Sequence, residues 1–161
     1  MTIREMEPQR LKEALDLVWR VFLEFEAPDY SEQGVATFHE FIEYDAMEKR
    51  IRDGEIALWY AQEDGAVVGV VALRPQTGQA TEHAVHGHIS LLFVEKRHHK
   101  KGIARRLVET ATSGHTTVTV NSSPYAVEIY KRLGFVNTAC EQLQDGIRYI
   151  PMKRGGITGE A

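Results

Sequence analysis

The stretch between Lys96 and Arg106 has the composition of an anion-binding site. It holds six Lys or Arg residues and no acidic residue, although the 161-residue chain carries a net charge of −4. Gly102 lies inside this stretch, and a residue without a side chain lets the backbone approach a ligand closely. We expect a helix to begin at Gly102, where free N–H groups and the positive end of the helix dipole would bind phosphate. The alternative is a turn without a ligand, whose basic side chains are solvated.

The common nucleotide-binding fingerprints do not explain this glycine turn. The sequence contains neither GxxxxGK(S/T) nor GxGxxG, so neither a P-loop nor a Rossmann dinucleotide site is predicted. The negative net charge argues against general nucleic-acid binding, and we expect no nucleic-acid partner. A basic patch that binds nucleic acid beside a chance glycine turn is the alternative, and such binding would depend steeply on salt.

Three histidines and one cysteine are further candidates for site chemistry. His83, His86 and His88 have the spacing H-x2-H-x-H, which could supply metal ligands, but no HExxH motif and no cysteine partner accompanies them. We therefore expect a polar loop here and no metal. Cys140 is the only cysteine, so an internal disulfide is excluded, and we expect it to be a buried small apolar side chain.

The bulk composition indicates one soluble domain. Hydrophobic residues make up 43% and charged residues 26% of a chain that is long enough for a single core. The first ten residues contain no apolar stretch typical of a signal peptide, and no apolar run reaches membrane-spanning length. Together with the single cysteine, these features favour the reducing cytoplasm and no membrane partner.

Hydrophobic periodicity and turn residues place the candidate residues on alternating strands and helices. In the first half we expect a strand at 3–6, a helix over 7–26, a second helix or a broken pair over 31–52, and a hairpin of strands 56–62 and 66–74. In the second half we expect a polar loop at 76–86, a buried strand at 88–95, a helix over 102–113, a strand at 116–120, a helix over 124–134, and strands at 135–143 and 147–152. This order predicts one mixed α/β sheet with helices on both faces, followed by a disordered tail over 155–161.

Two segments resemble the GNAT superfamily of acyl-CoA-dependent N-acyltransferases. The segment HKKGIA, His99 to Ala104, follows the apolar LLFV and resembles the pyrophosphate loop R/Q-x-x-G-x-G/A of that family. Gly102 and Ala104 match this pattern, whereas His99 replaces the usual Arg or Gln. The later segment NSSPYAVEIYKRLGF resembles a second family motif, in which an asparagine ends a strand and a helix carries a tyrosine four residues before Gly-Phe. The resemblance extends over about residues 55–153.

The resemblance implies both the fold and the ligand. It implies one domain over residues 1–154, with a twisted, mostly antiparallel sheet of about seven strands and about four helices on both faces. It also implies acetyl-CoA as co-substrate, with the diphosphate at the glycine turn and the pantetheine arm along a bulged strand at Leu92 to Val94. The residues expected to contact acetyl-CoA are Leu92, Phe93, Val94, His99, Lys100, Lys101, Gly102, Ile103, Ala104, Arg105 and Asn121.

Acyl transfer to an amine makes three chemical demands. Negative charge on the carbonyl oxygen needs a donor, which the resemblance assigns to a backbone N–H of the bulged strand. The departing thiolate needs a proton, which it assigns to the phenol of Tyr130. The amine must be neutral, and deprotonating a lysine-like amine at pH 7 costs about 4.6 kcal/mol. His88 occupies the strand position from which family members often supply a base, and a water relay is the alternative.

The acceptor side is predicted to favour a cation. The segment from Val21 to Glu48 contains eight acidic residues, six aromatic residues and no Lys or Arg. Acids beside aromatic faces favour a polyamine, an amino sugar or a lysine-like amine, carried by a small molecule or a peptide. The alternative is that the aromatic residues belong to the core and the acids are solvated. A non-catalytic acyl-CoA sensor of the same fold is the alternative function, and the acyl length and the oligomeric state, a homodimer included, stay open.

Overall fold

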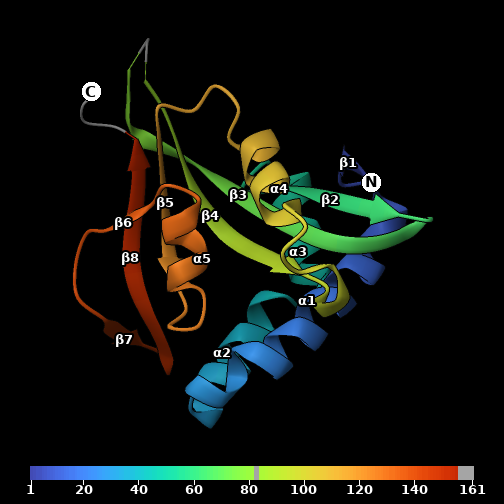
Figure 1. Cartoon of the computed structure of the whole chain (residues 1–161), viewed down its shortest axis with the longest axis horizontal. Helices are drawn as coiled ribbons and strands as arrows, with labels where there is room; N and C mark the ends of the chain where they lie inside the picture. Colours follow the sequence, from blue (N-terminus) through green and yellow to red (C-terminus); the bar gives the residue numbers. More distant parts are fainter. Residues whose placement is uncertain (82–83, 156–161) are drawn as a thin grey trace.

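Eight strands form one sheet in the order β1-β2-β3-β4-β5-β8-β6, and β7 pairs with β8 off this path. The structure, a computed structural model, describes residues 1–81 and 84–155, and Figure 1 shows its layers. The strands are β1 (Thr2–Glu5), β2 (Ala57–Glu63), β3 (Ala66–Thr81), β4 (Ala84–Val94), β5 (Thr117–Ser122), β6 (Val136–Asn137), β7 (Gln142–Gln144) and β8 (Ile147–Gly155). The helices are α1 (Leu11–Phe25), α2 (Glu32–Phe41), α3 (Tyr44–Arg52), α4 (Ile103–Ala111) and α5 (Val127–Arg132), with short 3-10 turns η1 (Pro8–Arg10), η2 (Ala27–Asp29) and η3 (Lys96–His98).

Helices cover both faces of the sheet, which confirms the predicted mixed α/β fold. Helices α4 and α5 lie on one face, and α1, α2 and α3 lie on the other (Figure 1). Each face has its own core, because neighbouring strand residues point to opposite sides. The segment 31–52 is the broken pair, α2 and α3, rather than one helix. No helix in the described part of the chain is long and apolar enough to cross a membrane.

β4 separates from β5 about halfway along its length. The two strands pair in parallel only through residues 86–89 of β4 and 117–120 of β5. On the other edge of β4, the register with β3 shifts so that Ser90 has no residue opposite it. A bulge of this kind bends its strand, and the bend carries the rest of β4 away from β5. The expected bulge at Leu92 to Val94 therefore lies earlier, at Ser90.

The position of the bulge follows from the two cores. Ile89 packs in the core under α4 and α5, whereas Leu91 packs in the core under α1. In a regular strand, residues two apart point to the same face. The extra residue at Ser90 lets these two apolar side chains reach opposite faces of the sheet. The bulge is therefore required at the point where the buried residues of β4 change from one core to the other.

The predicted loop at 76–86 is wrong, because both strands of the hairpin continue through it. β3 runs to Thr81, β4 begins at Ala84, and Gln76 pairs with His86. The pairing of β2 with β3 ends at Leu73, so beyond that residue β3 pairs only with β4. A two-stranded ribbon that extends beyond the layered part of the sheet needs no apolar face. A polar composition is therefore compatible with strands in this segment and is not evidence for a loop.

The strand predicted at 135–143 is instead two short strands, β6 and β7. β6 pairs with residues 152–153 of β8, and β7 pairs with residues 147–149. Between these two ladders lies Pro151, which has no N–H to offer a partner strand. Cys140 lies in the connection between β6 and β7 and is exposed, so the prediction of a buried cysteine is also wrong.

α2 packs directly against the turn that joins β7 to β8. Gly34 of α2 is buried and faces Gly146, which has a φ of 81°. A Cβ at Gly146 would lie far inside contact distance of the Gly34 backbone. Nearby, the hydroxyl of Thr37 donates a hydrogen bond of 2.9 Å to the carbonyl of Asp145. These contacts join the first helices to the last hairpin, and Thr37 and Ile147 of these elements line a cavity described below.

We expect Gly146→Ala to destabilise the protein more than Gly65→Ala does. Both glycines follow an aspartate in a hairpin turn and have a φ of 81°, so alanine at either position introduces the same left-handed strain, about 1–2 kcal/mol. A Cβ at Gly65 meets nothing within 4 Å, whereas a Cβ at Gly146 meets Gly34. Urea denaturation should therefore show an additional loss of about 1 kcal/mol or more for Gly146→Ala. Equal losses for the two variants would contradict the direct contact.

Candidate functional site

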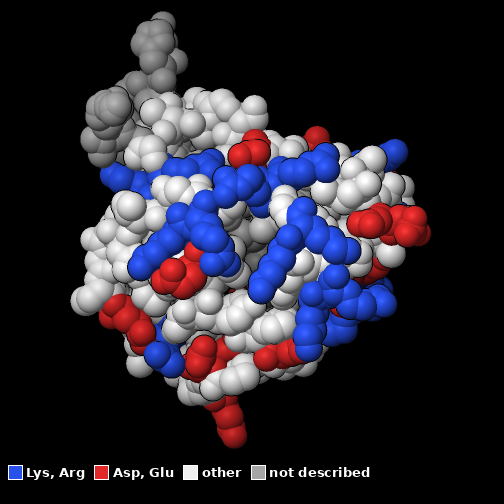
Figure 2. Space-filling view, viewed as in Figure 1, with Lys and Arg blue, Asp and Glu red and all other residues white. Residues whose placement is uncertain are grey.

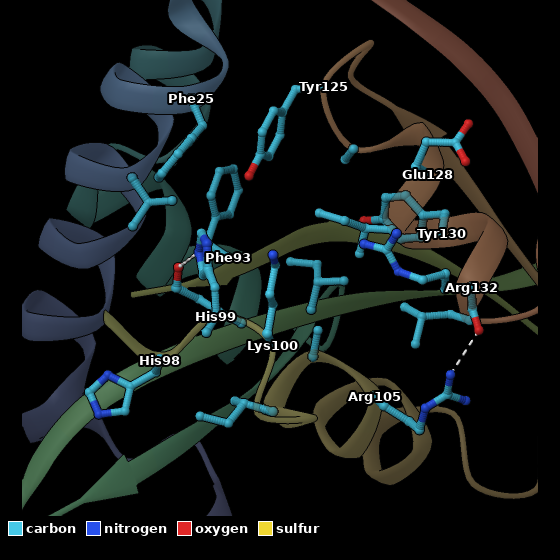
Figure 3. A pocket seen from close by; sticks show the side chains of 18 of the residues that line it. Phe25, Phe93, His98, His99, Lys100, Arg105, Tyr125, Glu128, Tyr130 and Arg132 are labelled. Carbon is cyan, nitrogen blue, oxygen red and sulfur yellow. Dashed lines mark hydrogen bonds between the residues drawn. The ribbon is translucent and has the colours of Figure 1, made fainter. Parts of the chain in front are cut away.

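A cavity of about 590 Å³ opens between α1, the end of β4, the start of α4 and α5. Figure 3 shows how side chains from these elements converge on it. Of the residues expected to contact acetyl-CoA, those that line this first cavity are Leu92, Phe93, Val94, His99, Lys100, Gly102, Ile103, Ala104 and Arg105. The structure thus brings together nearly all residues of the glycine turn and the end of β4. Lys101 and Asn121 are not among its lining residues.

The glycine turn leaves the first N–H groups of α4 without intrahelical partners. Gly102 is the N-cap of α4, has a φ of 79°, and supplies no side-chain cap. The first helical hydrogen bond runs from the N–H of Arg106 to the carbonyl of Gly102, at 3.1 Å. The N–H groups of residues 103–105 therefore remain for a ligand or for water. A Cβ at Gly102 would meet nothing within 4 Å, so the space in front of the turn is open.

His99, which departs from the family pattern, holds the turn against β4. Its Nε2 lies 2.8 Å from the carbonyl oxygen of Val94, and a carbonyl only accepts, so the ring nitrogen donates. The ring also packs against Phe25, with a distance of 5.3 Å between the ring centroids. His99 therefore positions the loop between strand and helix.

Basic side chains border the cavity on the face shown in Figure 2. Lys100 and Arg105 line it, and Arg105 donates a hydrogen bond of 2.8 Å to the carbonyl of Arg132 (Figure 3). Lys100 has a φ of 65°, which is unusual for a residue with a side chain. Lys101 lines a different hollow, beside Glu63 and Glu95. Lys100 and Lys101 therefore line different hollows, although they are neighbours in the sequence.

The open edge of β4 forms one wall of the first cavity. Beyond Ile89, β4 has no strand partner on the β5 side among the described residues. Main-chain N–H and C=O groups on such an edge need partners, and a ligand with amide groups can supply them. Leu92 and Val94 lie on this wall.

Tyr130 is buried at the inner end of the first cavity. It lies on α5 and packs edge-on against Phe135, with ring centroids 5.4 Å apart. Burial, and then the negative charge of Glu26, raise the pKa of Tyr130 above that of a free phenol. The hydroxyl therefore stays protonated at neutral pH and can act as a donor.

A second cavity, of about 270 Å³, meets the first at Tyr130. The residues that line both cavities are Glu26, Leu92, Phe93, Ala126 and Tyr130. Asn121, a predicted acetyl-CoA residue, lines the second cavity and not the first. Tyr30, Phe38 and Phe41 also line the second cavity, and all three pack against the core as well. Aromatic residues of the 21–48 segment therefore serve both the core and the cavity.

Glu26 is the residue of this site that sequence reasoning missed. It was one of eight acids in the 21–48 segment, and no motif distinguished it. Burial raises the pKa of Glu26 to about 7, a hydrogen bond from Ser123 opposes this shift, and the charge of Asp29 adds to it. The only signal in the sequence is its place directly after an apolar helix face and two residues before Pro28.

His88, the predicted base, lines neither cavity. Its Nδ1 lies 2.8 Å from the hydroxyl oxygen of Thr119 on β5. Burial, and to a smaller extent the charge of Arg74, lower the pKa of His88 to about 4. The imidazole is neutral at pH 7 and can accept a proton, but a proton from an amine beside Tyr130 would reach it only through other groups. Its role as a base stays a prediction.

The described part of the chain shows no group of three His, Cys, Asp or Glu residues suited to a metal. His83, one of the three histidines considered as ligands, lies outside the described residues. His86 and His88 lie on β4 and pair with Gln76 and Arg74 of β3.

Comparisons with known proteins agree with this fold. A family model described as an acetyltransferase (GNAT) domain matches residues 26–155. No curated protein matches the chain. The fold is similar to that of PaiA N-acetyltransferase from Thermoplasma acidophilum in complex with coenzyme A, at 16% identity, with 96% of this chain and 98% of that chain covered and a TM-score of 0.71.

Two other solved structures have a similar fold. An aminoglycoside 6′-N-acetyltransferase complexed with coenzyme A is 18% identical, with 96% of each chain covered and a TM-score of 0.65. A GCN5-related N-acetyltransferase from Rhodopseudomonas palustris is 16% identical, with 96% of this chain and 94% of that chain covered and a TM-score of 0.70. At such identities the likeness shows a shared fold, whereas the family model spans most of the chain.

We expect the ring of His88 to stay neutral down to about pH 4. Because the unfolded chain binds this proton near pH 6.5 and the folded chain near pH 4, stability falls as the pH drops between these values, by up to about 3 kcal/mol. NMR titration of the histidine rings, assigned with His88→Gln, measures the midpoint directly. The variant should also lose this part of the pH dependence of unfolding. A midpoint near 6.5 in the wild type would contradict the burial of the ring.

Proposed function

Because the chain belongs to the GNAT acetyltransferase family, we propose that it transfers an acetyl group directly from acetyl-CoA to a primary amine of a small molecule or peptide. The observation that carries this proposal is the junction of the two cavities at Tyr130. The first cavity extends from the uncapped start of α4 to this phenol, and the second reaches it from the side lined by Glu26 and by aromatic residues of the 21–48 segment. A thioester and an amine could therefore approach one point from opposite directions.

The first cavity fits a carrier that has an anionic diphosphate and a long amide-containing arm. The free N–H groups of residues 103–105, the helix dipole and Lys100 supply local positive charge at one end. The unpaired edge of β4 supplies donors and acceptors in a row for the two amide groups of the arm. A cavity of about 590 Å³ lies within the usual range for sites of small ligands.

The inner end of the cavity supplies the groups that acyl transfer requires. A main-chain N–H in the 92–94 segment would donate to the thioester carbonyl, whose oxygen gains negative charge in the transition state. Tyr130 would donate its proton to the departing thiolate. Because burial and Glu26 raise the pKa of this phenol, the protonated form is fully available at pH 7.

Thiol release measures the proposed activity. The protein is incubated with acetyl-CoA and a panel of spermidine, glucosamine and lysine, free CoA is followed with a thiol reagent, and products are identified by mass spectrometry. A product that is heavier than the amine by the mass of one added acetyl group would support N-acetylation. Tight binding of acetyl-CoA without turnover on any amine would instead support the non-catalytic sensor.

We expect Gly102→Asp to weaken CoA binding at least about 10-fold, because its carboxylate would face the diphosphate at the start of α4. Gly114→Asp is the matched control. Gly102 and Gly114 have φ values of 79° and 80°, and at neither would a Cβ meet an atom within 4 Å. The two variants therefore carry the same strain and charge, but Gly114 lies outside the cavity. Isothermal titration with CoA measures both affinities, and equal affinities would remove the argument for a diphosphate at Gly102.

We expect Tyr130→Phe to lower kcat about 10²-fold or more while the dissociation constant of acetyl-CoA changes less than about threefold. Phenylalanine keeps the ring that packs against Phe135 but removes the proton donor. Steady-state kinetics and calorimetric binding separate the two effects. Equal losses in turnover and binding would make Tyr130 a binding residue rather than an acid.

A further inference from the structure

Glu26 lies where the two cavities of the site meet. It directly follows the last residue of α1, and together with Tyr130 it lines both cavities. Among the described residues that line the second cavity, it is the only one with a carboxylate or an imidazole. Glu128, the other acid at the first cavity, is exposed and does not reach the second. Among the described residues, Glu26 is therefore the one carboxylate that lines both cavities together with Tyr130.

The surroundings of Glu26 leave its charge without a cationic partner. Ser123 donates a hydrogen bond to the carboxylate. Phe25, the residue before Glu26, stacks on Tyr125, with ring centroids 5.2 Å apart, and so joins the end of α1 to the residues before α5. Figure 3 shows these two rings. None of the ion pairs in the described structure includes Glu26. An unpaired carboxylate in a poorly solvated place is costly, and such groups concentrate at functional sites.

We propose that Glu26 binds the ammonium group of the acceptor and accepts a proton from it, an inference that rests on the proposed acetyl transfer. A cation that enters the second cavity would pass the rings of Tyr30, Phe38 and Phe41 and then meet a single carboxylate beside Tyr130. Aromatic faces and one unpaired carboxylate recognise a primary ammonium. The cavity volume of about 270 Å³ fits a compact aliphatic amine better than a folded chain segment.

The proton balance assigns one role to each of two residues. The ammonium transfers one proton to the Glu26 carboxylate and becomes a neutral amine. The amine nitrogen then forms a bond to the thioester carbon, and the carbon–sulfur bond breaks. Tyr130 gives its proton to the thiolate. The attacking nitrogen still carries two protons, and it gives one of them to Tyr130 as it becomes the amide nitrogen. Glu26 releases its proton to solvent after the products leave, so one amide, one thiol and one proton result.

The position of Glu26 accounts for the reaction more directly than that of His88 does. Glu26 lines the cavity that contains Tyr130, whereas His88 is hydrogen bonded to Thr119 outside both cavities. A carboxylate that titrates near the working pH is also well matched to proton abstraction, because it is ionised and still basic.

The ionisation of Glu26 depends on groups from every element packed around it. Burial raises its pKa to about 7, Ser123 lowers it, and Asp29 of η2 raises it. The negative charge of Glu26 in turn raises the pKa of the phenols that face it, which belong to Tyr30, Tyr125 and Tyr130. The positive charge of Arg148 of β8 opposes this effect by lowering the pKa of Tyr30. A bound ammonium would stabilise the ionised carboxylate, so the raised pKa belongs to the enzyme without its acceptor.

Kinetics of Glu26→Gln test the proposal with the amine that the wild type acetylates fastest in the panel of spermidine, glucosamine and lysine. We expect kcat/KM for the amine to fall about 10²-fold or more while CoA affinity changes less than about threefold. The wild-type kcat/KM should decline below about pH 7, and this acid limb should be absent from Glu26→Gln and kept in His88→Gln. Glu40→Gln is the matched control, since Glu40 is exposed on α2 and lines neither cavity, and its kinetics should equal those of the wild type.

Stability supplies a readout that does not require turnover. Because Glu26 has a higher pKa in the folded chain than its ordinary 4.5, the folded state holds the proton longer, and stability falls as the pH rises from about 4.5 to about 7. The urea midpoint of the wild type should decline over this range relative to that of Glu26→Gln.

A wild type that binds CoA but acetylates no amine would overturn the proposed function. Wild-type kinetics in Glu26→Gln, or an acid limb lost only in His88→Gln, would overturn the role of Glu26 while the function stands.

Discussion

The separation of β4 from β5 beyond Ile89 is the constraint on which the site depends. Strands that part leave main-chain groups without ladder partners, and buried groups of this kind are costly unless something else pairs with them. Here the same extra residue, Ser90, directs Leu91 into the core under α1 and opens β4 toward α5. Core packing and site formation therefore have one structural cause. A ligand that pairs with the open edge would satisfy groups that the fold itself leaves available.

Local signals in the sequence were sufficient to predict the elements at the first cavity. A glycine, which can adopt a left-handed φ, follows an apolar strand and precedes an amphipathic helix, and these three features form a continuous local pattern. In the structure, Gly102 has this φ and is the N-cap of α4. The tyrosine four residues before Gly134 also falls at the cavity, because helix spacing and a glycine stop are local as well. The order of strands and helices was predicted for the same reason.

Features that depend on tertiary packing could not be predicted in this way. In the sequence, nothing distinguishes Glu26 from the other acids of the 21–48 segment. Only the packing of α5 and the residues before it beside Glu26 desolvates its carboxylate. Cys140 was expected to be buried, but β6 and β7 leave its segment uncovered. The polar composition of the segment 76–86 predicts a loop, whereas the pairing of β3 with β4 makes it part of a hairpin. The position of the bulge also depends on which core each side chain enters.

Burial at the cavity junction has opposite chemical uses for its two ionisable groups. Removing water disfavours both anions, so it raises the pKa of the Tyr130 phenol and of the Glu26 carboxylate alike. For the phenol this keeps a proton in place until a thiolate needs it. For the carboxylate it raises basicity to the range in which a proton can be taken from an ammonium and later released. The negative charge of Glu26 further protects the proton of Tyr130, and transfer of a proton to Glu26 would remove that protection. The phenol would then become a better acid at the stage when the carbon–sulfur bond breaks, so the cavity junction could couple the two proton transfers without a third residue.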